Sequence, residues 1–141
     1  MKRKANAVWT GTLKEGRGTL TTESGALSQQ PYTFVTRFEE GVTGSNPEEL
    51  LAAAEAGCFT MALNNDLTMA GHQPVEVRTE ATTELNRIDG KPTITHVHLV
   101  TRARVPGIDQ ATFQKFAEDT RNNCIVSRAL NVEFTLDAKL E

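Results

Sequence analysis

The sequence contains no apolar stretch long enough to cross a membrane and no long run of basic residues. Its longest basic run is Lys2-Arg3-Lys4, and the net charge is −3, so we expect neither a membrane nor a nucleic acid as a partner. The basic N-terminal residues have no apolar segment behind them, which argues against a secretory signal and predicts a cytoplasmic protein. Internal repeats, low-complexity tracts and linkers are also lacking, so residues 1–141 are expected to form a single domain.

Motifs of several large enzyme classes are missing as well. The chain has no phosphate-binding loop, no dinucleotide-binding glycine motif and no serine at a nucleophile elbow. His96 and His98 lie two positions apart on one predicted strand face and could bind a metal together, but no third ligand has a suitable spacing. We therefore interpret them as surface histidines and expect no metal or other cofactor.

Cysteine is represented only by Cys58 and Cys124. In a reducing cytoplasm a permanent structural disulfide between them is not expected. The two residues are either buried thiols that pack as small hydrophobic side chains or reactive groups. The cysteine count alone does not separate these two interpretations.

Hydrophobic periodicity predicts three strands, a long helix, two long strands, a second helix and a last strand. Alternating side chains indicate strands within residues 5–9, 19–22, 31–38, 75–85, 96–105 and 131–140. Arg37 would then lie on a strand, on the same face as Thr33 and Val35. Turn residues such as Asp89-Gly90 join neighbouring strands as hairpins, so we expect a mostly antiparallel sheet and an α+β fold.

The long helix begins at Asn46-Pro47-Glu48-Glu49, because asparagine suits the N-cap and proline the first helical position. Gly71 supplies the stop, which predicts a helix over residues 47–70 that is about 35 Å long. Its middle has few charges and many small apolar residues, so we expect it to be buried around most of its circumference. The short strands of one chain cannot cover such a helix, and an obligate homodimer is therefore expected.

Cys58 lies in the middle of this apolar helix. A thiol in such surroundings is inert unless a cationic group stabilises its thiolate. Arg37 is a candidate for that cation, although an arginine on a half-apolar face more often extends to solvent. Glu48 suits the helix dipole in the first turn. Ten residues of helix separate it from Cys58 by about 15 Å, so Glu48 could reach a Cys58 only from a second subunit.

Cys124 follows the second helix, which Asp109 caps, and opens a short helical turn that ends near Leu130. Backbone N–H groups at the start of that turn are expected to lower the pKa of Cys124. The alternative is that Cys124 is a small core residue beneath the second helix.

Seven segments spread over nearly the whole chain match the pattern of one protein family. The sequence resembles the OsmC/Ohr superfamily of thiol peroxidases, and the joint match of the Asn46-Pro47-Glu48 block, Cys58 and a distal Cys124 is specific to that superfamily. The segments Gln29-Gln30-Pro31-Tyr32 and Thr36-Arg37-Phe38-Glu39 look more like the OsmC branch than the organic hydroperoxide resistance (Ohr) branch. The matching segments are Thr22-Glu23-Ser24-Gly25, Gln29-Gln30-Pro31-Tyr32, Thr36-Arg37-Phe38-Glu39, Asn46-Pro47-Glu48-Glu49-Leu50, residues 56–63, residues 105–109 and Cys124-Ile125-Val126-Ser127.

The resemblance implies an intertwined α+β homodimer with two active sites at its interface. It implies that Cys58 is the peroxidatic cysteine, Cys124 the resolving cysteine, Arg37 the activating arginine and Glu48 its carboxylate partner. Departures from the family pattern include Ile125, which stands where a proline often follows the resolving cysteine. Glu55 and Gly57 also vary the helix around Cys58.

The function that the resemblance implies is reduction of organic hydroperoxides to alcohols in oxidative or osmotic stress defence. A sulfenic acid on Cys58 and a Cys58–Cys124 disulfide would be the intermediates, and a lipoyl-type or thioredoxin-like dithiol the reductant. Leu51, Ala54, Phe59 and Met61 predict an apolar entrance that favours organic hydroperoxides over hydrogen peroxide. The alternatives are a non-catalytic dimer of the same fold and a redox sensor.

Overall fold

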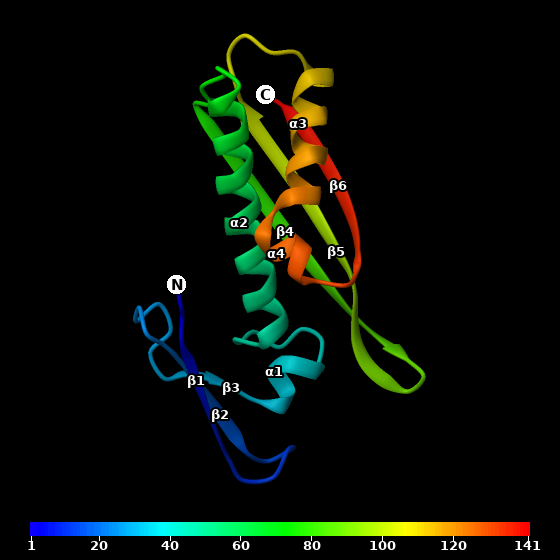
Figure 1. Cartoon of the computed structure of the whole chain (residues 1–141). Helices are drawn as coiled ribbons and strands as arrows, with labels where there is room; N and C mark the ends of the chain where they lie inside the picture. The colour runs from blue at the N-terminus through cyan, green and yellow to red at the C-terminus, as the bar shows by residue number, and fades with distance from the viewer. The chain divides into compact units, whose positions relative to one another are not determined.

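A computed structural model describes all 141 residues and shows two compact units, residues 1–50 and residues 51–141 (Figure 1). The division falls within helix α2 (Pro47–Met69), whose first turn belongs to the first unit. The expectation that the whole chain is a single domain stays a prediction. None of the helices is both long enough and apolar enough to cross a membrane.

The first unit contains a small antiparallel sheet. Its strands β1 (Ala5–Thr10), β2 (Arg17–Thr22) and β3 (Gln30–Tyr32) are hydrogen-bonded in that order, which confirms the first two predicted strands. Every fully buried apolar side chain of the protein lies in the other unit. The first unit therefore has little hydrophobic core of its own.

The predicted strand over residues 31–38 is wrong beyond Tyr32. Residues Phe34–Phe38 form a short helix, α1. Thr33 caps it, because its hydroxyl accepts a hydrogen bond from the Thr36 backbone at 3.1 Å and the Thr36 hydroxyl accepts one from the Thr33 backbone at 2.9 Å. This reciprocal cap stabilises the helical turn against an extended chain. Arg37 consequently projects from a helix and not from a strand.

Both ends of α2 confirm the sequence signals. At the start, the Asn46 side chain accepts a hydrogen bond from the Glu49 N–H at 2.8 Å. At the end, Gly71 has a φ of +88°, which L side chains rarely adopt. Its N–H bonds to the Thr68 carbonyl while the His72 N–H bonds to the Leu67 carbonyl, so the last turn ends in a Schellman motif.

Within a single chain, α2 is buried on one face only. The opposite face, which was expected to be covered as well, is exposed. The small apolar residues in the middle of the helix become buried only where another surface packs against them. The buried positions are Glu48, Glu55, Phe59, Leu63 and Leu67, and the exposed ones include Ala53, Ala54, Gly57 and Met61.

The second unit is built on a three-stranded sheet of β4 (Glu76–Ile88), β5 (Lys91–Arg104) and β6 (Glu133–Leu140). β4 and β5 form a long antiparallel hairpin through Asp89 and Gly90, both with positive φ, as a two-residue turn requires. β6 pairs with β5 in parallel. The sheets are therefore mostly antiparallel, as predicted, with one parallel pair.

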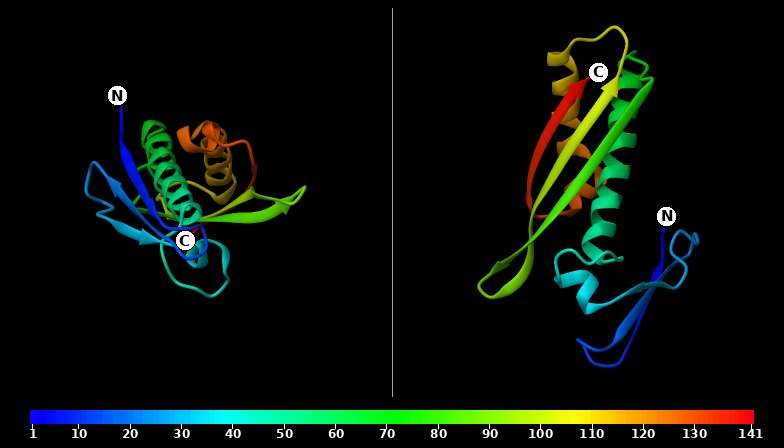
Figure 2. Two further views of the ribbon diagram at one scale, coloured as in Figure 1. Left: turned by 90° about the horizontal axis from the view of Figure 1, so that it is seen from below. Right: turned by 180° about the vertical axis from the view of Figure 1, so that it is seen from behind.

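Two further helices join β5 to β6. α3 (Gln110–Asn123) is capped by Asp109, whose carboxylate accepts a hydrogen bond from the Thr112 N–H at 2.7 Å, and α4 (Ile125–Ala129) follows directly. The part of α2 in the second unit and α3 cover the same face of the sheet (Figure 2). The core between them contains Phe59, Leu63 and Leu67 of α2, Val97 and Leu99 of β5, and Phe113 and Ala117 of α3.

Candidate active site

The two cysteines, 66 positions apart in the sequence, meet in the second unit. Both are free thiols, and their Sγ atoms are 2.8 Å apart, with the Cys124 thiol donating toward Cys58. Cys58 comes from the middle of α2, where it is partly exposed, whereas Cys124 is buried between the end of α3 and the start of α4. The Cys124 N–H bonds to the Thr120 carbonyl at 2.7 Å and its carbonyl accepts from the Arg128 N–H at 3.0 Å. The backbone on both sides therefore fixes the position of this thiol.

The expectation of a lowered pKa for Cys124 is wrong. Burial raises the pKa of this thiol, and so does its hydrogen bond to Cys58. The Ser127 and Val126 N–H groups at the start of α4 act in the opposite direction, as the sequence suggests, but they are outweighed. Cys124 is thus held as a neutral thiol.

A second contact, between Ser127 and Glu55, links α4 to α2. The Ser127 hydroxyl of α4 donates a hydrogen bond to Oε1 of Glu55 in α2 at 2.5 Å. Both side chains are buried, and Oε2 of Glu55 has no hydrogen-bond partner. The sequence interpretation missed both residues as parts of the site. The signal that could have indicated them is a lone carboxyl group three residues before Cys58, in an otherwise apolar stretch.

Arg37 and Glu48 meet in the first unit. The Arg37 Nε donates to Oε1 of Glu48 at 3.0 Å and to Oε2 at 3.3 Å, and Nη2 donates to Oε1 at 2.9 Å. The Arg37 side chain is 39% exposed and that of Glu48 10%. A bidentate pair of this kind fixes the plane of the guanidinium group, and Nη1 stays outside it. The Arg37 guanidinium also lies 5.0 Å from the centre of the Phe38 ring.

The four residues predicted from the sequence therefore form two pairs. Cys58 and Cys124 belong to the second unit, and Arg37 and Glu48 to the first. α2 carries one member of each pair and runs without a break through both positions.

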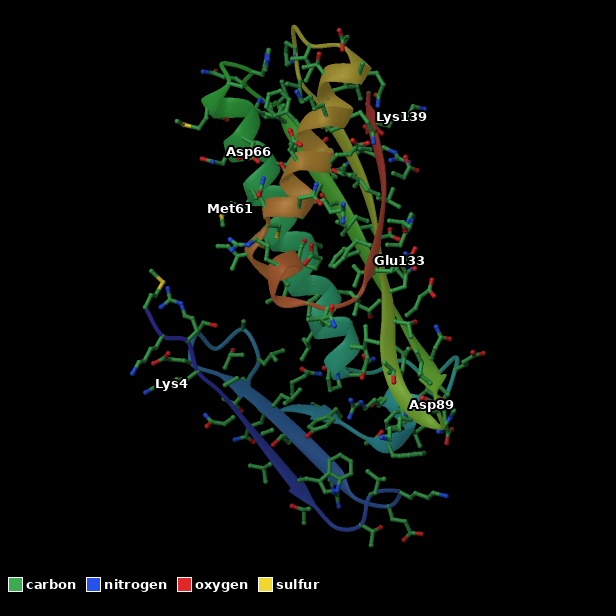
Figure 3. All side chains as sticks on the ribbon, turned by 45° about the vertical axis from the view of Figure 1, so that its right-hand side comes forward. Lys4, Met61, Asp66, Asp89, Glu133 and Lys139 are labelled. Carbon is green, nitrogen blue, oxygen red and sulfur yellow. The ribbon has the colours of Figure 1, made fainter.

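A shallow groove follows the exposed face of α2 beside β4. Figure 3 shows Met61 pointing outward from the helix, and its side chain is 73% exposed. Phe59, which was expected at an apolar entrance, is instead fully buried in the core. The groove is lined by Ala56, Gly57, Thr60, Met61, Asn64, Val77 and Thr79.

The two strand histidines contact neighbouring side chains on the sheet. His96 lies 3.2 Å from a Glu84 carboxylate oxygen and 2.9 Å from the Thr135 hydroxyl. His98 lies 2.6 Å from the same hydroxyl, and the two imidazole rings stack with their centres 6.3 Å apart. This arrangement agrees with their interpretation as surface histidines.

Comparison with known proteins places the chain in a family. Residues 39–138 match the family model described as OsmC-like protein. The chain is 46% identical over 139 residues to the peroxiredoxin OsmC of Escherichia coli, a match that covers 99% of this chain and 96% of that protein, and it is equally similar to the peroxiredoxin OsmC of Shigella flexneri. The chain belongs to the OsmC family within the OsmC/Ohr superfamily.

Solved structures agree on the fold. The organic hydroperoxide resistance protein OhrB of Bacillus subtilis matches with a TM-score of 0.69 and 26% identity over 96% of this chain and 98% of that one. An organic hydroperoxide resistance protein from Elizabethkingia anophelis matches with a TM-score of 0.76 and 24% identity over 100% and 99% of the two chains. The α+β fold expected from the resemblance is confirmed.

Proposed function

We propose that this protein is a cysteine-based peroxidase that reduces organic hydroperoxides to alcohols and serves in oxidative or osmotic stress defence. The observation that carries the proposal is the 2.8 Å contact between the free thiols of Cys58 and Cys124. Membership of the OsmC family and similarity to proteins named as peroxiredoxins support it.

The chemistry follows from the two sulfurs. The Cys58 thiolate attacks the terminal oxygen of ROOH, the O–O bond breaks, and the alkoxide leaves as the alcohol after taking up a proton. Cys58 is then a sulfenic acid. The Cys124 sulfur attacks it, the S–O bond breaks, and the hydroxyl group leaves as water with the thiol proton of Cys124. A disulfide needs the sulfurs at about 2.05 Å, so a small movement from 2.8 Å is enough.

Regeneration requires an external dithiol. Thiol–disulfide exchange returns Cys58 and Cys124 to thiols and oxidises the partner. We propose a lipoyl-type or thioredoxin-like dithiol as the reductant and a reducing cytoplasm as the compartment.

The Arg37 guanidinium, held by Glu48, supplies the positive charge that a reactive thiolate needs. Glu48 holds the guanidinium group through Nε and Nη2, and Nη1 is then available to hydrogen-bond an oxygen of the peroxide. Ten residues of unbroken α2 separate Glu48 from Cys58, a rise of about 15 Å. We therefore propose that the pair acts on the Cys58 of a second subunit.

Two features support a homodimer with its sites at the interface. The groove along α2 leaves Met61 and neighbouring small residues exposed. The first unit has little hydrophobic core, and a sheet of three strands needs an apolar surface to pack against. A second copy of the chain would cover both.

Substitution of each cysteine tests the proposal. Cys58→Ser is expected to abolish peroxide consumption, whereas Cys124→Ser should consume about one equivalent and then stall with Cys58 as a sulfenic or overoxidised acid. Mass spectrometry after one peroxide pulse identifies these species. Many turnovers by the wild type indicate an enzyme, one equivalent a redox sensor, and none a non-catalytic dimer. Activity retained by Cys58→Ser and lost in Cys124→Ser would reverse the two roles.

Substrate preference provides a second test. The exposed apolar side chains on α2 lead us to expect a higher kcat/KM for cumene hydroperoxide than for hydrogen peroxide. The two values are measured with the same dithiol reductant, so that the reductive half of the cycle is common to both. Equal values, or a preference for hydrogen peroxide, contradict an organic substrate.

A further inference from the structure

Glu55 is a buried ionisable residue that the proposed mechanism does not use. Its side chain is 0% exposed in the apolar middle of α2. One carboxyl oxygen accepts the Ser127 hydroxyl, and the other is buried without a hydrogen-bond partner. Burying a carboxyl group with an unpaired oxygen costs free energy, which an apolar side chain of similar size would avoid. Stability alone therefore does not account for a glutamate at this position.

Glu55 and Ser127 are each three residues from one of the two cysteines. Glu55 precedes Cys58 by three residues, and Ser127 follows Cys124 by three. Residues three apart are neighbours on a helix surface. The Sγ–Sγ contact of 2.8 Å and the Oγ–Oε1 contact of 2.5 Å thus join α2 and α4 at adjacent points.

The hydrogen bond to Glu55 is well suited to anchor α4. This helix has five residues, Ile125–Ala129, and one turn of helix is only marginally stable by itself. Ser127 is its buried residue, while Ile125 at its start is 78% exposed. The hydrogen bond from Ser127 to Glu55 is short, at 2.5 Å, and both side chains are buried, where an unmade hydrogen bond would be costly.

We infer that Glu55 is a positioning residue for disulfide formation: through Ser127 it holds α4 against α2, so that the Cys124 thiol stays within reach of Cys58 after Cys58 has been oxidised. The inference deepens the proposed function and rests on it for the identity of the two reacting sulfurs. The bonds that form and break are those of the disulfide step above, and Glu55 contributes no atom to the products. Its effect is to raise the effective concentration of one thiol at the other.

The chain offers a matched control for this contact. Asp66 of α2 accepts a hydrogen bond from the buried Thr120 hydroxyl of α3 at 2.7 Å. It is the same kind of bond from the same helix, but eight residues beyond Cys58. Thr120 contacts Cys124 through its backbone carbonyl and Asp66 through its hydroxyl. Asp66→Asn should therefore lower stability with little change in the pairing of the cysteines.

The first experiment measures the equilibrium constant for the Cys58–Cys124 disulfide in mixtures of reduced and oxidised dithiothreitol. Replacing the carboxyl group by an amide in Glu55→Gln, or removing the hydroxyl in Ser127→Ala, is expected to lower this constant roughly tenfold or more. Ser127→Thr keeps a hydroxyl and should stay near the wild type. Asp66→Asn should stay within about twofold of the wild type even though its melting temperature falls.

A kinetic experiment separates the two halves of the reaction. In a Cys124→Ser background, Glu55→Gln should change the rate of Cys58 oxidation by cumene hydroperoxide by no more than about twofold, because the residue acts on α4. With both cysteines present, Glu55→Gln should slow disulfide formation by roughly the factor found at equilibrium. A merely structural residue would slow both steps together.

Two results would overturn the inference. One is an Asp66→Asn protein whose disulfide constant falls as far as that of Glu55→Gln. The other is a wild-type constant in both Glu55→Gln and Ser127→Ala. If Glu55→Gln does not fold, the comparison of Ser127→Ala with Ser127→Thr decides. Because the dithiothreitol exchange needs no peroxide, failure of the proposed function and failure of this inference are distinguishable.

Discussion

In the proposed mechanism, the surroundings of Cys124 determine how readily its sulfur can attack the oxidised Cys58. Burial and the hydrogen bond to Cys58 raise the pKa of this thiol, and the N–H groups of α4 only partly offset them. Attack on a sulfenic acid requires the thiolate form. At neutral pH only a small fraction of Cys124 is ionised, so we expect ionisation of this residue to limit disulfide formation.

This leads to a pH dependence of the second step. Below the pKa of a thiol, its thiolate fraction grows about tenfold per pH unit. The rate of Cys58–Cys124 disulfide formation after a peroxide pulse should therefore rise steeply between about pH 6 and pH 8 and should not level off below the ordinary thiol value of about 8.5. Rapid quenching with an alkylating agent followed by mass spectrometry measures the rate. A rate independent of pH over this range contradicts the prediction.

At the residue scale the sequence predicted which groups react, but not the contacts that hold them. Cys58 and Cys124 are the only thiols, and Glu48 belongs to a recognisable helix start, so few residues could have been chosen. The bond between Glu55 and Ser127 joins positions 72 residues apart, and no local pattern predicts such a contact. The raised pKa of Cys124 was missed for the same reason, because burial is a property of the tertiary structure.

At the scale of elements, the Asp109 cap stabilises the start of α3, the helix that carries Cys124 at its far end. The Asp109 carboxylate accepts the Thr112 N–H at 2.7 Å, and this hydrogen bond lowers the pKa of Asp109. A lowered pKa in the folded state stabilises the fold above the ordinary aspartate value of about 3.9. That contribution is lost as the pH falls through the lowered value.

Substitutions of Asp109 test this link. Asp109→Ala is expected to lower the midpoint of urea unfolding at pH 7, and the gap to the wild type should shrink as the pH falls below about 4. Asp109→Asn keeps an acceptor without the charge, so the difference in urea midpoint between Asp109→Asn and Asp109→Ala should stay nearly constant with pH. Urea titrations of the three proteins between about pH 7 and pH 3 provide the measurement. A gap between wild type and Asp109→Ala that is the same at both ends contradicts the assignment.

Elements with a familiar start or stop sequence were predictable, and α1, whose cap is formed by two threonines, was not. Asn46-Pro47 and Gly71 bound α2 within a residue of the prediction, and Asp109 marks the start of α3. The alternation of side chains over residues 31–38 fits a strand, but the reciprocal hydrogen bonds of Thr33 and Thr36 favour a helical turn. In a segment this short, one local hydrogen-bond pair outweighs the hydrophobic pattern.

At the scale of the whole molecule, the exposed face of α2 and the weak core of the first unit both favour a second subunit. Sequence composition led to the same expectation, because a helix with many small apolar residues needs cover on more than one side. The exposed groove along α2 includes Met61 and Val77, and we propose that it is the surface that a second copy covers. The structure also shows that Arg37 and Glu48 of one chain form a pair, so that both would reach a partner's site together.

Mixing two defective proteins tests whether the sites are shared between subunits. Glu48→Gln removes the carboxylate that holds Arg37, and Cys58→Ser removes the nucleophile, so each parent should be nearly inactive. If the Arg37–Glu48 pair acts on the partner's Cys58, each mixed dimer has one complete site and one site lacking both groups. Equal mixing with free exchange then restores about a quarter of the wild-type activity. Glu49→Gln, an exposed neighbour in the same helical turn, is the control for a lost charge at the helix start and should be active before mixing. If mixed dimers form, as native mass spectrometry can show, and activity does not return, Glu48 serves the Cys58 of its own chain.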